Sequence, residues 1–278
     1  MAKLDVAVPT FNRAELLREA LICLRDQDYE EFKVTVFDNA SNDNTREVVL
    51  DEFMHDPRFE YRRNDMNIGP GANFQLALHQ SEAEYFMWRA DDDLSDPTYV
   101  GALLRCLEDD PSLELAYSSC EQVTENSRKL VEAGSRRDED PGRVVDLLLD
   151  CKPTWVYGMW RRTALQSNRR AFEETGYPFL WASDHLILLP SLLKGAAAPV
   201  PDTRFIQRII GSADYALQPR EQLQARAEFR WHAHEMMEQL TDPSYRSEIA
   251  TALEHHIEQR VGRKWSLRRR ILRGMLRL

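Results

Sequence analysis

The sequence predicts an α/β fold with a central, mostly parallel sheet and helices on both of its faces. Three observations lead to this class. Short β-rich segments alternate with segments of helical apolar spacing through the first part of the chain. Polar clusters, or Gly and Pro, separate these segments and mark loops. The 278 residues are enough to bury a substantial core in one large domain, with or without an appendage.

The elements follow one another as strand and helix. β-rich residues at 4–8 predict a first strand that ends at Pro9, and leucines at helical spacing predict a helix over 14–25. The elements expected next are a strand at 32–37, a helix at 45–54, a strand at 59–62, a helix at 72–79 and a strand at 85–88. Residues 121–143 are charged and lack an apolar period, so we expect a mobile loop there.

The charge of the chain changes along its length. There are 36 basic and 46 acidic side chains, and eight of the basic ones lie between Arg260 and Arg277, after the last acidic residue, Glu258. The rest of the chain is therefore strongly acidic. This distribution argues against a nucleic-acid binder and indicates a basic tail with a partner of its own.

The cysteines and the apolar stretches indicate the compartment. The four cysteines are widely spaced without a Cys-x-x-Cys pair, which indicates neither a zinc site nor a disulfide framework. The N-terminal residues do not resemble a secretory signal, and no stretch reaches the roughly 18 apolar residues of a membrane span. We expect a cytoplasmic protein.

Polar residues gather where three of the expected strands end. These clusters are Thr10, Asn12 and Arg13 after the first strand, residues 38–43 after the second and residues 91–93 after the fourth. Ligands of parallel sheets bind beyond the carboxyl ends of the strands. Two of the aspartates have simpler interpretations. Asp43 can cap the helix that follows it, and Asp96 precedes Pro97 as an N-cap would.

Asp91, Asp92 and Asp93 are too many carboxylates for one helix cap. Three adjacent like charges repel one another, so at neutral pH such a group takes up protons or binds a cation. Hard oxygen ligands favour Mg²⁺ or Mn²⁺, and such an ion normally completes its shell with water and phosphate. The triple therefore predicts a site for a metal-bridged diphosphate.

Four motifs in order resemble one known family. The segments VAVPTFNRAELLREALICLRDQDY, VTVFDNASNDNT, NDMNIGPGANFQLAL and YFMWRADDDLSDP are similar to the nucleotide-sugar half of the inverting family 2 glycosyltransferases, which have the Rossmann-like GT-A fold. The resemblance covers about residues 3–118. It implies a GT-A domain over 1–212, with a nucleotide-sugar half at 1–118 and an acceptor half at 119–212, followed by a helical C-terminal extension at 213–278.

The resemblance assigns roles to individual residues. It implies a nucleotide-sugar site formed by Pro9, Thr10, Arg13, Asp38, Asn67, Gly69, Asp91 and Asp92. Within this set, Asp38 matches the aspartate that meets the nucleobase, and Asp91 is assigned to the ribose. Asp93 is assigned to the metal ion, Mg²⁺ or Mn²⁺. Many relatives have an acid where this chain has Ala90, which leaves the register inside the triple open by one residue.

A second group of residues concerns the acceptor side. In WASDHLIL, Asp184 matches the family's catalytic base, although Ser183 replaces the usual Glu; its other interpretation is a helix-start residue stabilised by the helix dipole. His185 is an alternative base. The segment TWVYGMWRR resembles the strand under the acceptor site, where Trp155 and Trp160 would stack on sugars or fill the core, and His185 could also contact the acceptor.

The implied function is a metal-dependent inverting glycosyltransferase of hexosyl or deoxyhexosyl type. It would move a sugar from a nucleoside-diphosphate sugar to a hydroxyl of a glycan, a lipid-linked acceptor or another glycoconjugate, as in cell-surface polysaccharide synthesis. Two alternatives stay open. A sugar-nucleotidyltransferase would need a Gly-rich loop after the first strand, which VPTFNRAELL lacks. A catalytically silent carbohydrate-binding protein of the same fold would bind the nucleotide without turnover.

The C-terminal region has two parts. Residues 215–240 are expected to form a helix that packs on the catalytic body or joins subunits of a homo-oligomer. From Val261 to Leu278, apolar and arginine side chains fall on opposite halves of a helix. Such a helix suits peripheral contact with an anionic inner membrane face, or packing on the acidic body.

Overall fold

The computed structural model describes residues 2–134, 141–210 and 219–261. These residues form two compact units. The first contains residues 2–134, 154–167 and 197–210, and the second contains residues 141–153, 168–196 and 219–261. The boundaries expected at 118 and 212 separate the nucleotide-sugar half, the acceptor half and the C-terminal extension by what they bind. The two units are defined by how the chain packs, so they do not test those boundaries, which stay a prediction.

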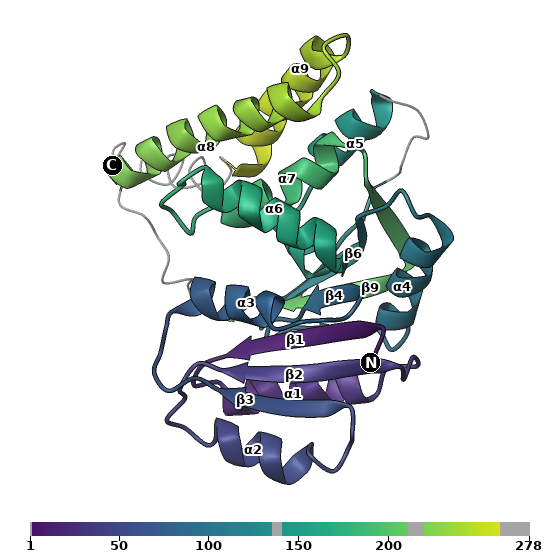
Figure 1. The fold of residues 1–278 in the computed structure, drawn as a ribbon, viewed down its shortest axis with the longest axis vertical. Coiled ribbons are helices and arrows are strands. Elements are labelled where there is room, and N and C mark those ends of the chain that lie inside the picture. The colour runs from purple at the N-terminus through teal and green to yellow at the C-terminus, as the bar shows by residue number, and fades with distance from the viewer. Residues whose placement is uncertain (1, 135–140, 211–218, 262–278) are drawn as a thin grey trace. The chain divides into compact units, whose positions relative to one another are not determined.

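The described part of the first unit is built on a nine-stranded sheet (Figure 1). Its strands are β1 (Leu4–Thr10), β2 (Phe32–Asp38), β3 (Phe59–Arg63), β4 (Tyr85–Trp88), β5 (Leu94–Ser95), β6 (Leu115–Thr124), β7 (Ser127–Val131), β8 (Met159–Arg161) and β9 (Ala197–Arg208). Their order is β3-β2-β1-β4-β8-β6-β9-β5, with β7 beside β6. Strands β1, β2, β3 and β4 pair with one another in parallel, and β6 pairs with β9 in parallel. The antiparallel pairs are β8 with β4 and β6, β5 with β9, and β7 with β6. The mostly parallel sheet is confirmed.

Helices cover both faces of this sheet. One face packs against α1 (Ala14–Arg25), α2 (Thr45–Glu52) and α4 (Tyr99–Asp109) in a single apolar core. Residues alternate along each strand, so β1 directs Leu4, Val6 and Val8 into this core. On the other face lies α3 (Pro70–His79), whose Phe74 carbonyl accepts a hydrogen bond from Trp88 Nε1 at 3.0 Å. The predicted α/β class is confirmed.

Strand β8 enters the sheet where a side chain has no room. A Cβ on Gly158 would lie 2.3 Å from the Ala116 carbonyl oxygen, so only glycine allows this close approach. Just before it, a 3₁₀ turn, η1 (Pro153–Tyr157), brings the chain back to the sheet. The Arg161 guanidinium then joins β8 to the last turns of α4 and to the segment before β6, because it donates to the carbonyl oxygens of Leu107 at 2.6 Å and Leu113 at 2.8 Å.

The second unit is helical in its described residues. It contains α5 (Gly142–Asp150), α7 (Ser183–Leu193), α8 (Pro219–Leu240), α9 (Arg246–His256) and a π-helical turn, η2 (Ile257–Val261). Helix α6 (Arg162–Glu174) begins in the first unit and ends in the second. Helix α5 contacts α7 and α9, and α8 contacts α7 and α9. Helices at the C-terminal end are therefore confirmed, although α8 starts at Pro219 and residues 215–218 lie outside the described residues.

The mobile loop expected at 121–143 is wrong for its first half. Residues up to Thr124 continue β6, and β7 pairs with them from Ser127 to Val131. Almost every side chain of β7 is exposed, so its sequence has no apolar alternation from which a strand could be predicted. The strand is defined by its backbone pairing with β6. Residues 135–140 of the expected loop lie outside the described residues.

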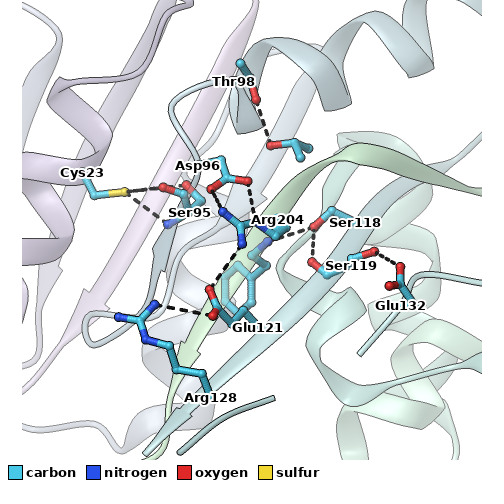
Figure 2. Close-up of polar contacts among 12 residues, drawn as sticks. Cys23, Ser95, Asp96, Thr98, Ser118, Ser119, Glu121, Arg128, Glu132 and Arg204 are labelled. Atoms are coloured by element: carbon cyan, nitrogen blue, oxygen red, sulfur yellow. Dashed lines mark hydrogen bonds and ion pairs between the residues drawn. The ribbon is translucent and has the colours of Figure 1, made fainter. Parts of the chain in front are cut away.

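Asp96 does not cap a helix with its side chain. Helix α4 begins at Tyr99, and the carboxylate of Asp96 instead forms a bidentate ion pair with Arg204 of β9, with both N–O distances at 3.0 Å (Figure 2). The same guanidinium reaches Glu121 of β6, which in turn pairs with Arg128 of β7. The N-cap prediction failed because a cation 108 residues away competes for the carboxylate.

No helix within the described residues is long and apolar enough to cross a membrane. Residues 262–278, which hold nearly all of the basic amphipathic segment, lie outside the described residues.

Candidate functional site

The carboxyl ends of β1, β2 and β4 meet at one edge of the sheet. Parallel register places Thr10 opposite Asp38, and Ala7 opposite Trp88. The same register, extended by three residues, brings Asp91 level with Thr10. The Thr10 hydroxyl donates a hydrogen bond to Asp91 Oδ2 at 2.7 Å, and both side chains are buried. Strand order thus brings together the polar clusters that follow the first, second and fourth strands.

Two arginines contact the acidic triple. Arg13 donates from Nη1 to Asp92 Oδ2 at 2.7 Å and to Asp91 Oδ1 at 3.3 Å. Arg208, the last residue of β9, donates its backbone N–H to Asp93 Oδ1 at 2.8 Å and its Nε to the carbonyl oxygen of Asp92. These charge-assisted hydrogen bonds offset part of the repulsion within the triple.

Burial makes ionisation costly for two of the three carboxylates. Asp91 is 7% exposed and Asp93 is 4% exposed. Burial raises the pKa of Asp91 to about 6, against the opposing effect of its hydrogen bonds. Burial and the adjacent charge of Asp92 raise the pKa of Asp93 to about 7. Positive charge beside these groups would stabilise their ionised forms.

Arg89 is a buried cation that precedes the triple. It is fully buried, and its Nη2 donates to Ser95 Oγ at 3.0 Å. Its guanidinium lies 5.1 Å from the ring centre of Tyr99 and 5.4 Å from that of Phe205. Among the described residues, Nε and Nη1 have no hydrogen-bond partner. Its charge opposes the rise in the pKa of Asp93.

The set of hard oxygen donors fits a divalent cation. Asp91, Asp92 and Asp93 offer carboxylate oxygens of the kind that Mg²⁺ and Mn²⁺ prefer. An ion at this edge would supply the positive charge that favours ionised Asp91 and Asp93 despite their burial. The chemistry of the residues is therefore compatible with the predicted metal.

Asp38 lies at the end of β2 among hydrogen-bond donors. It is fully buried and accepts bonds from the Ser41 backbone N–H at 2.8 Å, from the Tyr61 hydroxyl and from Arg63 Nη1 at 3.2 Å. Burial and the bond to Asp38 raise the pKa of Tyr61, so its hydroxyl stays protonated. Tyr61 and Arg63 also line a hollow in the surface. The expected nucleobase position is thus organised by two side chains of β3 that the motifs did not single out.

Asparagines join the segment after β3 to the end of β2. Asn39 Nδ2 donates to Asn67 Oδ1 at 2.8 Å, and Asn64 Nδ2 donates to Asn39 Oδ1 at 3.0 Å. Asn67 Oδ1 also accepts the Gly69 N–H at 2.8 Å. Gly69 has φ +85°, and a Cβ there would meet nothing within 4 Å, so backbone conformation and not space calls for glycine. Asn67 and Gly69 are therefore placed next to the expected nucleobase position through Asn39.

Asp43 serves the two helices that start at this edge. Its Oδ2 accepts the Ala14 N–H of α1 at 3.1 Å, and its Oδ1 accepts the N–H and hydroxyl of Thr45 at 3.1 and 2.6 Å. Burial tends to raise the pKa of Asp43, but these hydrogen bonds bring it below its ordinary value. Asp43 therefore stabilises the starts of both helices with its side chain, as the capping interpretation expected, although the N-cap residue of α2 is Asn44.

The aromatic residues expected at the acceptor are buried in the first unit. Trp155 stacks on Tyr117, with ring centres 3.5 Å apart and planes 17° apart. Trp160 is fully buried, and its Nε1 donates to the Val156 carbonyl oxygen at 3.0 Å. Neither ring presents a face on which a sugar could stack in this conformation, because both fill the core beside the sheet. Of the two interpretations of Trp155 and Trp160, the burial of both rings supports packing in the core.

Asp184 and His185 lie in the first turn of α7, in the second unit. Asp184 is half-buried, and its Oδ1 accepts the backbone N–H of His185 at 2.9 Å. A carboxylate in the first turn is stabilised by the helix dipole. The His185 ring is buried, with its Nδ1 3.8 Å from Cys151 Sγ. Of the two candidate bases, Asp184 is therefore the more accessible.

Comparison with known proteins identifies related sequences. Residues 5–144 match a family model described as glycosyl transferase family 2. Over 94 residues, 34% of this chain, the sequence is 37% identical to the GalNAc(5)-diNAcBac-PP-undecaprenol beta-1,3-glucosyltransferase of Campylobacter jejuni, of which the match covers 30%. Over 97 residues, 33% of this chain, it is 32% identical to an abequosyltransferase of Salmonella typhimurium, of which the match covers 29%. The chain thus spans less than a third of these relatives.

Solved structures extend the likeness to almost the whole chain. TarS residues 1–349 of S. aureus, in complex with UDP-GlcNAc, superimpose with a TM-score of 0.72 at 18% identity, covering 95% of this chain and 75% of that one. A mannosyltransferase from Pyrobaculum calidifontis, in complex with GDP-Man and Mn²⁺, superimposes with a TM-score of 0.58 at 17% identity, covering 93% and 70%. At these identities the likeness is one of fold.

Proposed function

The chain belongs to glycosyl transferase family 2 and has the GT-A fold, and on this premise we propose that it is a metal-dependent inverting glycosyltransferase. It transfers a hexosyl or deoxyhexosyl group from a nucleoside-diphosphate sugar to a hydroxyl group of a glycan or glycoconjugate. The observation that carries the proposal is the buried acidic pair, Asp91 and Asp93, at the edge where β1, β2 and β4 end.

The donor half of the site is assigned to the first unit. Asp38, with Tyr61 and Arg63 around it, faces the nucleobase, and the segment at Asn67 and Gly69 lies beside the base and ribose. Asp38 already accepts hydrogen bonds from Ser41, Tyr61 and Arg63. We therefore assign part of the nucleobase recognition to its neighbours on β3. Pro9 is opposite Phe37 in the sheet and next to Thr10, and we assign it to the same side of the site.

The acidic triple divides into a ribose side and a metal side. Asp91 is oriented by Thr10 and Arg13, at the end of β1, which suits a contact with the ribose. Asp92 shares Arg13 with it. Asp93 is held from β9 and is our candidate metal ligand. A bound Mg²⁺ or Mn²⁺ would neutralise charge on the departing diphosphate.

Asp184 is the proposed general base. Inversion requires a group that removes the proton of the acceptor hydroxyl as its oxygen attacks the anomeric carbon. Asp184 is half-buried in the first turn of α7, where the helix dipole favours a carboxylate anion, the form that accepts a proton. Trp155, Trp160 and His185 have no part in the proposal. Trp155 stacks on Tyr117 and the Trp160 ring is enclosed in the core, and the His185 ring packs against His256 and Cys151.

The acceptor class follows from what the relatives are called. One is named for a polyprenol diphosphate-linked glycan and another, TarS, for poly(ribitol-phosphate). We propose an acceptor of the same kind, a lipid-linked or polymeric glycan of the cell surface. Peripheral contact of a cytoplasmic enzyme with the inner membrane face through the basic tail would bring it to such an acceptor.

Metal-dependent nucleotide binding tests the donor site. UDP, dTDP, GDP and CMP are added to the full chain with and without Mn²⁺, and thermal unfolding is recorded. A nucleotide present at 100 times its Kd stabilises by about 2.7 kcal/mol, a rise of roughly 5 °C or more in Tm. The rise should require Mn²⁺ and be lost in Asp93→Asn but not in Asp109→Asn, an exposed control on α4. No metal-dependent rise with any nucleoside diphosphate would refute the proposal.

Substitution of the base tests the catalytic step separately. Asp184→Asn should lower the release of nucleoside diphosphate from the sugar nucleotide by roughly 10²- to 10⁴-fold, since general-base catalysis contributes about that much. The nucleotide-induced rise in Tm should not change. Asp202→Asn, at an exposed position of β9, serves as the matched control. Activity retained in Asp184→Asn would assign the base to another residue.

A further inference from the structure

Three metal-ligating side chains meet inside the second unit. Cys151 directly follows α5, His185 lies in the first turn of α7, and His256 is the last residue of α9. All three are buried, and one potential ligand atom from each lies within 4.8 Å of the other two. Helix α5 contacts both α7 and α9 (Figure 1). The cluster therefore connects three helices that are far apart in the sequence.

The atoms already have much of the geometry of a metal site. The distance between Cys151 Sγ and His185 Nδ1 is 3.8 Å. In a tetrahedral site with Zn–S of about 2.3 Å and Zn–N of about 2.1 Å, this distance is roughly 3.6 Å. The rings of His185 and His256 are adjacent, with centres 4.9 Å apart. All three ligand atoms lie within 4.8 Å of one another, so a contraction of at most roughly 1.4 Å would bring them to tetrahedral separations.

The orientation of His256 is set by a backbone group. Its Nδ1 lies 2.9 Å from the Leu148 carbonyl oxygen of α5, which can only accept a hydrogen bond. Nδ1 therefore carries the proton, and the lone pair of the neutral ring is on Nε2. A metal-bound histidine typically donates its other N–H in this way, to a backbone carbonyl or a carboxylate.

We propose that Cys151, His185 and His256 bind one Zn²⁺ ion, with water as the fourth ligand. On binding, the Cys151 thiol releases its proton to solvent and the thiolate and two neutral imidazoles donate to the metal. A thiolate with two imidazoles suits Zn²⁺ and not Mg²⁺ or Mn²⁺, which prefer oxygen. The ion holds the end of α5, the start of α7 and the end of α9 together.

This inference goes beyond the proposed function and is independent of it. The oxygen ligands of Asp93 are in the first unit, and the sulfur and nitrogen ligands are in the second. Zinc binding is measured without nucleotide, and Asp93→Asn should bind zinc as the wild type does. Failure of the nucleotide experiment would therefore leave the zinc site untouched, and the reverse also holds.

The test is zinc binding by the full chain. Metal is removed with a chelator, Zn²⁺ is added back against a competing indicator, and stoichiometry and affinity are read out. We expect one Zn²⁺ per chain and an affinity at least 100-fold lower in Cys151→Ser and in His256→Gln. Cys106→Ser and His255→Gln are matched controls, since Cys106 lies in α4 of the first unit and His255 is exposed beside His256. Both should bind as the wild type does.

Cobalt substitution identifies the ligands even if a variant folds poorly. Co²⁺ bound in place of Zn²⁺ should give the wild type a thiolate-to-cobalt charge-transfer absorption, which Cys151→Ser should lack and Cys106→Ser should keep. A wild type that takes up no zinc overturns the proposal. So does a cobalt spectrum without a thiolate band, or ligand variants that bind zinc as tightly as their controls do.

Discussion

Thr10 and Asp91 illustrate how single contacts hold the candidate site. Thr10 is buried at the end of β1, and its hydroxyl is 2.7 Å from Asp91 Oδ2. The sequence predicted both as site residues, because each directly follows or ends a strand. It could not predict that they bond to each other, since this depends on β4 lying next to β1 in parallel register.

Removal of this hydroxyl should destabilise the protein. Thr10→Val keeps the shape of the side chain and leaves a buried acceptor with one donor fewer, which should lower the free energy of unfolding by about 1–3 kcal/mol. Urea unfolding of Thr10→Val, Thr10→Ser and wild type measures the difference, with Thr10→Ser expected near wild type. Equal stability of the valine and serine variants would mean that the hydrogen bond contributes nothing.

Other residues around the site were missed because they come from distant segments. Arg208 contacts the acidic triple from 115 residues away, and Tyr61 and Arg63 reach Asp38 from β3. Each is an ordinary strand residue in the sequence, with no turn or cluster around it. Only the order of strands in the sheet brings them to the same edge.

At the scale of elements, the ion pair between Asp56 and Arg58, in the turn between α2 and β3, connects neighbouring segments. Asp56 accepts the backbone N–H of Arg58 at 2.9 Å and its guanidinium at 2.7–3.1 Å. The guanidinium also donates to the Arg25 carbonyl oxygen, at the end of α1, and lies over the Phe32 ring of β2. Asp56 thus holds the side chain that joins three elements.

This turn should give the protein a measurable acid sensitivity. Hydrogen bonding to Arg58 holds the pKa of Asp56 below its ordinary value of 3.8. A carboxylate whose pKa is lowered by folding stabilises the protein above the unfolded-state pKa, and this stability is lost as pH falls through the folded-state pKa. Asp56→Asn should therefore cost about 1–2 kcal/mol at pH 7, and the difference from wild type should shrink below pH 4.

Denaturant unfolding from pH 7 to pH 3 measures this difference. Asp51→Asn, an exposed position on α2, is the matched control and should differ little from wild type at any pH. A difference for Asp56→Asn that does not change with pH would show that the carboxylate is not what matters.

At the scale of the whole molecule, the basic residues near the C-terminal end should bind the protein to anionic membrane surfaces. Eight basic residues lie between Arg260 and Arg277, and each is worth about 1 kcal/mol near an anionic membrane surface. The full chain should therefore float with anionic vesicles at low salt and less so at high salt. Truncation after Glu258 should abolish this binding.

Two controls make the flotation experiment specific. Neutral vesicles should not retain the full chain, and replacement of Arg269, Arg270 and Arg273 by Gln should weaken binding to anionic vesicles without shortening the protein. Thermal unfolding of the truncated chain should match that of the full chain. Unchanged flotation after truncation would assign the membrane contact to residues before 259.

Local patterns in the sequence were enough to predict the α/β class, the family and the position of the acidic triple. Apolar periodicity identifies strands and helices, and polar residues directly after strands mark the ligand edge of a parallel sheet. The hairpin at 121–131 was not predicted, because the exposed side chains of β7 show no apolar periodicity.

The tertiary structure decided which groups surround each carboxylate, whether Trp155 and Trp160 are exposed, and where Cys151 meets His185 and His256. The spacing of the cysteines indicated no zinc site, and the three residues that we propose as zinc ligands are 34 and 71 residues apart in the sequence. Burial and such convergence depend on contacts between distant segments. No local pattern encodes them, so only the folded chain reveals them.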